Sequence, residues 1–132
     1  MSKAVVFFAD GTEECEALLV VDLLRRAKVE VIVASAMGRR ELVSSHKIHL
    51  TADALAEEVD YSDVEGRNAT AHAGFQDQLA GAIVHDEEVV VDGNITTSYG
   101  LGGAIPFALE LVRQLAGQAE AERIRNAIAY RH

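Results

Sequence analysis

Four consecutive residues near the start of the chain, Glu13 to Glu16, carry three carboxylates and the only cysteine of the 132-residue sequence, Cys15. They follow an unbroken apolar run, Ala4 to Ala9, and a three-residue turn at 10–12. A strand that is apolar at every position is typical of a parallel sheet covered on both faces. Ligands of such sheets bind beyond the carboxyl ends of the strands, so any chemistry is predicted at residues 10–16.

Cys15 is the only possible thiol nucleophile, and Glu16 could give or accept a proton beside it. The amino end of a helix favours a thiolate by about 0.3–1 kcal/mol, whereas each glutamate in contact opposes it by about 1 kcal/mol even at high dielectric. We therefore expect a raised thiol pKa and favour an inert or interface cysteine over a catalytic one. For Glu16 we favour a solvated first-turn glutamate that complements the helix dipole.

The histidines and glycines give weaker signals. His72 ends a possible strand, where a catalytic base could lie, but no nucleophile accompanies it in a motif, so a strand-end histidine is the favoured interpretation. His46 and His49 are three residues apart, on opposite faces of a strand, and we predict no metal. The glycine-rich segment 100–103 could offer N–H groups to an anion, but it matches no nucleotide-binding motif. A tight turn is favoured there, and we predict no cofactor.

Elements at the start of the chain must position the candidate residues. Apolar residues at helical spacing predict a helix over about 13–27, and Asp10-x-x-Glu13 offers a carboxylate cap at its start. A second strand, Val29 to Ala34, follows after a minimal turn. Together they predict a right-handed βαβ unit.

The remaining elements are predicted from shorter patterns. In chain order they are a short polar strand pair within 41–50, a short helix from about Ala52 to Val59, a possible strand at 68–72, a hairpin over 89–97 that turns at Asp92-Gly93, a helix from the glycine segment to about Ala116, and a last helix from about Glu120 to Tyr130.

Composition excludes several classes of protein. A chain of this length fits one domain with a sizeable core. The net charge of −9 argues against a nucleic-acid or anionic-membrane partner, because phosphates require clustered Lys and Arg. A single cysteine forms no intrachain disulfide, no secretory segment precedes the first strand, and no apolar stretch approaches the length of a membrane span. We expect a cytoplasmic protein.

Both ends of the chain carry a family resemblance. The matching stretches are Phe8 to Ala17 with Val21 to Arg26, and then Glu65 to Thr70, Val91 to Ser98 and Phe107 to Leu109. In this order they resemble the ThiJ/PfpI superfamily, the DJ-type proteins. The resemblance implies a flavodoxin-like parallel sheet with flanking helices, and it places Glu16 on the glutamate that hydrogen-bonds a nucleophilic cysteine. It also implies cysteine-dependent glyoxalase or deglycase chemistry, or stress-chaperone function, on small carbonyl compounds or glycated groups.

The same resemblance implies a missing central segment. Family members run on from residues like 61–64 into a third parallel strand, a Gly-Gly oxyanion turn, a helix, a fourth strand and a nucleophile elbow bearing cysteine. Here Val64 is followed directly by Glu65. We therefore expect a single α/β, flavodoxin-like domain over 1–132, truncated in the middle between these two residues.

Two functions stay open at this point. One is the family's cysteine chemistry, with Glu16 assisting. The other is a catalytically inactive chain that persists as an oligomeric remnant or engineered, domain-swapped assembly module, and for turnover we favour this second hypothesis. Loss of the third strand would leave one edge of strand 4–9 unpaired, so we predict a homodimer or higher oligomer in which a second chain covers that edge.

Overall fold

The computed structural model describes residues 3–60, 89–92, 95–98 and 101–131. The chain opens with a βαβ unit: strand β1 (Lys3–Phe8), helix α1 (Glu14–Arg26) and strand β2 (Glu30–Ser35). The two strands pair in parallel with Val5 opposite Ile32. A two-residue strand, β5 (Ala54–Leu55), pairs in parallel on the other side of β2, so the order is β1-β2-β5. The predicted α/β class with a parallel sheet and flanking helices is confirmed.

Two antiparallel hairpins accompany this sheet. The first joins β3 (Glu41–Val43) to β4 (His49–Thr51), as the sequence predicts for 41–50. The second joins β6 (Val89–Asp92) to β7 (Ile95–Ser98). In the second hairpin Asp92 pairs with Ile95, so the connecting residues are 93–94, and Asp92 belongs to the strand rather than to the turn.

The prediction of a short helix from Ala52 to Val59 is wrong. The segment forms β5 and a single 3-10 turn, η1 (Ala56–Glu58). Pairing with β2 holds its first half extended, and the Glu58 carboxylate accepts a hydrogen bond from the Leu55 amide at 3.0 Å and pairs with Arg40 at 3.1 Å. A helix this short has too few internal hydrogen bonds to offset its nucleation cost against such partners.

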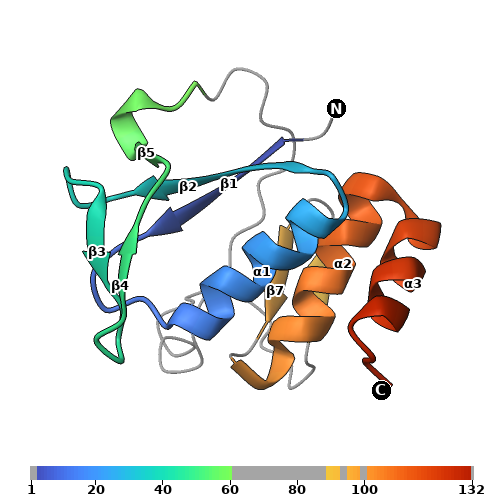
Figure 1. Ribbon diagram of the computed structural model, residues 1–132. Helices are drawn as coiled ribbons and strands as arrows, with labels where there is room; N and C mark the ends of the chain where they lie inside the picture. The colour runs from blue at the N-terminus through green and yellow to red at the C-terminus, as the bar shows by residue number, and fades with distance from the viewer. Residues whose placement is uncertain (1–2, 61–88, 93–94, 99–100, 132) are drawn as a thin grey trace.

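Three helices lie side by side next to the sheet (Figure 1). A 3-10 turn, η3 (Leu101–Gly103), leads into α2 (Ala104–Ala116), and Gly117 separates α2 from α3 (Gln118–Ala127). Helix α2 packs against α1, α3 and the β6–β7 hairpin. One hydrophobic core joins these elements, with Leu23, Leu24, Val112 and Ile124 almost completely buried in it.

Strand β1 is less buried than its sequence predicts. Phe8 is buried, and Ala4 and Val6 on the same face of the strand pack against the core. Phe7, on the opposite face, is 56% exposed, so the expected burial of both faces is wrong for the part of the chain that the structure describes. One face of the strand contacts the core. An apolar run in the sequence does not by itself show whether one face or both faces of a strand are covered.

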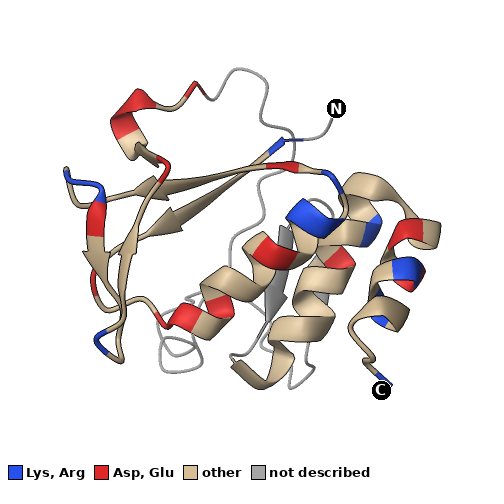
Figure 2. Cartoon of the chain, in the orientation of Figure 1, with Lys and Arg blue, Asp and Glu red and all other residues tan. Residues whose placement is uncertain are grey.

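Charge is polarised along α1. Its first turn carries Glu14 and Glu16 and its last turn carries Arg25 and Arg26, which complements the helix dipole at both ends (Figure 2). Within the described residues, no helix is both long and apolar enough to cross a membrane.

Candidate functional site

A tight turn carries the chain from the end of β1 into α1. The Ala9 amide donates to Thr12 Oγ1 at 3.1 Å, and the Thr12 amide donates back to the Ala9 carbonyl at 3.1 Å. Gly11 has φ +85°, a conformation that favours glycine. The turn delivers the glutamates and the thiol to the carboxyl end of the sheet, where the sequence predicts any chemistry.

The cap of α1 is Glu13, not the predicted Asp10. The Glu13 Oε2 atom accepts a hydrogen bond from the Glu16 amide at 2.7 Å. Asp10 instead faces the β3–β4 hairpin, where its carboxylate accepts from the Val43 amide at 3.0 Å and pairs with Arg39. These contacts were missed because Arg39 and Val43 lie 29 and 33 residues from Asp10 along the chain.

Backbone contacts dock the hairpin onto the turn. The Gly11 amide donates to the Val43 carbonyl at 2.9 Å, and the Ser45 amide donates to the Thr12 carbonyl at 3.0 Å. The Val43 amide lowers the pKa of Asp10, and Arg39 lowers it further against the opposing effect of desolvation. The ionised Asp10 is therefore part of the joint between hairpin and turn.

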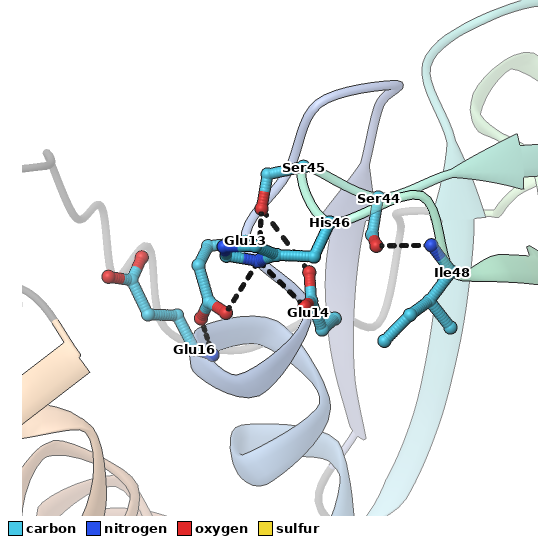
Figure 3. Close-up of polar contacts among 7 residues, drawn as sticks. All are labelled: Glu13, Glu14, Glu16, Ser44, Ser45, His46 and Ile48. Atoms are coloured by element: carbon cyan, nitrogen blue, oxygen red, sulfur yellow. Dashed lines mark hydrogen bonds and ion pairs between the residues drawn. The ribbon is translucent and has the colours of Figure 1, made fainter.

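The docked hairpin brings His46 to the start of α1 (Figure 3). Its Nδ1 atom lies 2.8 Å from Glu14 Oε1 and 3.1 Å from Ser45 Oγ, and Ser45 Oγ donates to Glu14 Oε2 at 3.2 Å. The Glu14 side chain is 10% exposed and that of His46 is 70% exposed. Desolvation raises the pKa of Glu14, but hydrogen bonds from its own amide and from the Ser44 side chain, together with the charge and hydrogen bond of His46, leave the pKa below its ordinary value.

Glu13 completes a three-residue cluster with Glu14 and His46. Glu13 Oε1 lies 3.9 Å from His46 Nδ1, and one donor atom from each of the three residues lies within 4.8 Å of the others. The sequence gives no signal for this cluster, because His46 and Glu14 lie 32 residues apart along the chain. Short-range spacing compares His46 only with near neighbours such as His49. These are the residues, among those described, that could hold a metal ion.

Cys15 lies on the exposed side of the first turn of α1. The charge of Glu13 raises the pKa of its thiol most, followed by desolvation and the charge of Glu14. The predicted direction of the pKa shift is therefore confirmed. A raised pKa leaves less of the thiolate that acts as a nucleophile.

The other two candidate residues do not join this cluster. Glu16 is half-buried on the first turn of α1, and in Figure 3 its carboxylate points away from Glu13, Glu14 and His46. His72, the candidate base, lies outside the described residues, as does the predicted strand at 68–72. In the part of the chain that the structure describes, the charged groups acting on the thiol are carboxylates.

A family model and individual relatives both relate this chain to DJ-1-type proteins. The model of the DJ-1/PfpI family matches residues 2–65 and 60–114. Protein DJ-1 homolog B of Arabidopsis thaliana is 26% identical over 177 residues, covering 95% of this chain and 40% of that protein. Protein dj-1beta of Drosophila melanogaster is 26% identical over 182 residues, covering 97% of both. The chain spans less than half the length of the two Arabidopsis relatives that it matches.

Solved structures show the same fold. A DJ-1 superfamily protein from Salmonella typhimurium, crystallised as a point mutant, superimposes with a TM-score of 0.86 at 23% identity, with 100% of both chains covered. Oxidized DJ-1 of Toxoplasma gondii gives a TM-score of 0.86 at 24% identity, also with 100% of both chains covered.

Proposed function

The chain belongs to the DJ-1/PfpI family, and from that premise we propose that it is a non-catalytic member, which keeps the scaffold and the acidic turn but not cysteine chemistry. One observation carries the proposal. The only thiol of the chain, Cys15, lies between glutamates on the first turn of α1, where their charge opposes the thiolate.

The resemblance supplies the activity that this chain is proposed to lack. It implies cysteine-dependent glyoxalase or deglycase chemistry, or stress-chaperone function, on small carbonyl compounds or glycated groups. That chemistry would need a cysteine elbow and Gly-Gly oxyanion donors. Family members carry both in a central segment that is missing here, where Val64 is followed directly by Glu65. Losing even one oxyanion donor typically costs about 10²–10³-fold in rate.

Two features of the comparisons support a shortened family domain over 1–132. The family model matches in two segments that meet at residues 60–65, next to the proposed deletion. The alignment with the Arabidopsis relative is 177 residues long although the chain has only 132. Both features are as expected if relatives carry a central segment that this chain does not.

The proposal includes assembly into a homodimer or higher oligomer. Apolar surface on β1 and α1 supports it, because Phe7 is 56% exposed and Leu18 is 39% exposed. A second chain that covered these side chains would remove apolar area from water. Sedimentation of a stable monomer at micromolar concentration would contradict the assembly.

The proposal also places the protein in the cytoplasm, which the single cysteine favours.

Consumption of methylglyoxal tests the proposed loss of catalysis. Purified protein, whose intact mass has been matched to the 132-residue sequence, is incubated with methylglyoxal beside a full-length DJ-1 relative as a positive control. We expect no turnover above buffer, and no difference between the wild type and Cys15→Ala. Turnover that disappears in Cys15→Ala, with the far-UV circular dichroism unchanged, would overturn the proposal.

A further inference from the structure

The Glu13–Glu14–His46 cluster joins two segments that are far apart in the sequence. The glutamates open α1, and His46 lies in the loop between β3 and β4. Two carboxylates and an imidazole from different elements meet at ligand-like distances. From this geometry we propose that Glu13, Glu14 and His46 bind one divalent transition-metal ion of the zinc class.

The distances are close to those that such an ion requires. Zinc binds imidazole nitrogen and carboxylate oxygen at about 2.0–2.2 Å, so donor atoms in a tetrahedral site lie about 3.3 Å apart. His46 Nδ1 lies 2.8 Å from Glu14 Oε1 and 3.9 Å from Glu13 Oε1, and one donor atom from each of the three residues lies within 4.8 Å of the others. An exposed His46 side chain can make the small adjustment that remains, and its exposure leaves room for a water molecule as the fourth ligand.

The donor set decides the class of ion. Calcium and magnesium prefer sites made of oxygen alone, whereas imidazole nitrogen suits zinc, copper and nickel. Three protein ligands with an open position match the zinc sites that keep a bound water molecule. Zinc is the ion we expect, and cobalt and nickel serve as probes of the same site.

Charge and positioning support a cation at this place. The cluster supplies two carboxylates, which outweigh the roughly half positive charge at the amino end of a helix. The remaining oxygen of Glu14 already accepts a hydrogen bond from the Ser45 hydroxyl, and the Ser45 amide donates a hydrogen bond to the Thr12 carbonyl, which holds Ser45 in place. Hydrogen bonds of this kind orient the ligands of known metal sites. The net charge of −9 also raises the local concentration of cations.

Isothermal titration with zinc chloride tests the site. Tag-free protein is stripped with chelator and dialysed at neutral pH. We expect one equivalent to bind in the wild type, and His46→Gln to weaken binding at least tenfold. The matched control is His49→Gln, which removes another exposed histidine of the same hairpin and should bind as the wild type does. Cys15→Ala should also bind normally, because the thiol is not among the three donors.

Three results would overturn the site. They are no binding in the wild type at millimolar zinc, unchanged binding in His46→Gln, and loss of binding in Cys15→Ala while His46→Gln still binds. His46 is exposed, so its variant should stay folded, and circular dichroism of the metal-free protein checks this. A second measurement needs no variant: substoichiometric cobalt should shift the His46 NMR signals first, and an earlier shift of another histidine would contradict the site.

Discussion

Leucines on opposite sides of α1 give a sharp test of the packing. Leu23 is 0% exposed in the core, whereas Leu18 on the same helix is 39% exposed. Replacing each with alanine leaves helix propensity nearly unchanged. The difference between the two variants therefore reports how much each side chain is buried in solution.

The expected magnitude follows from burial. Leu23→Ala removes fully buried carbons and leaves a cavity, which costs about 3 kcal/mol within the usual range for such sites. Unfolding entropy of about 2.1 cal/mol/K per residue over this chain converts that loss into a fall in Tm of about 11 °C. For a single chain, in which Leu18 is partly exposed, Leu18→Ala should cost about 1 kcal/mol or less, a fall of about 4 °C at most.

Thermal and urea unfolding followed by circular dichroism measure both variants at the same protein concentration. A loss of less than about 1 kcal/mol in Leu23→Ala would contradict its burial in the core. A loss in Leu18→Ala as large as that in Leu23→Ala would mean that the second chain of the proposed oligomer buries Leu18, and sedimentation of the same samples checks for that chain.

Three further predictions concern the turn and the helix ends. Glu13→Ala removes the cap of α1 and should cost about 0.5–2 kcal/mol in urea unfolding with chelator present, against no more than about 0.5 kcal/mol for exposed Glu57→Ala. Asp10 has a lowered pKa in the folded protein, so its stabilising effect is present above its unfolded pKa and is lost as pH falls through the folded pKa. The gap in urea midpoint between wild type and Asp10→Asn should therefore shrink between pH 6 and pH 3, and a gap that widens would contradict this. Gly117→Ala should cost about 1–3 kcal/mol in thermal unfolding through its φ of +93° alone, because nothing lies within 4 Å of the added Cβ; an unchanged Tm would contradict that strain.

Local patterns predicted much of the fold. The run Ala4 to Ala9 and the apolar spacing that follows it define β1 and α1 within one or two residues of the observed bounds. The two hairpins are found from short polar and β-branched stretches. These elements are specified by near neighbours in the sequence, so their pattern survives without knowledge of the tertiary structure.

The errors arise where a distant partner decides the structure. Residues 52–59 carry a helical pattern, but β2 pairs with Ala54 and Arg40 pairs with Glu58. The position of Asp10 depends on Val43, and its replacement as the cap by Glu13 follows from that contact. Contacts between segments that are far apart in the sequence have no signature in a single chain.

The candidate site shows the same division. The raised pKa of Cys15 was predicted correctly, because the glutamates that cause it are its immediate neighbours. The approach of His46 to Glu14 was not predicted, because it depends on how the β3–β4 hairpin folds back over the turn. Adjacent charges can be summed from the sequence, whereas a cluster assembled from two elements requires the fold.

The reactivity of the Cys15 thiol tests the claim that this chain holds no activated nucleophile. The rate of alkylation by iodoacetamide is measured from pH 6 to pH 10 with chelator present, and glutathione serves as the reference thiol. Neighbouring glutamates oppose the thiolate, so we expect slower alkylation than that of glutathione at pH 7 and a midpoint above the ordinary value for cysteine. A midpoint below the ordinary value, with rapid alkylation at pH 6–7, would show that this chain holds an activated nucleophile and would contradict the claim.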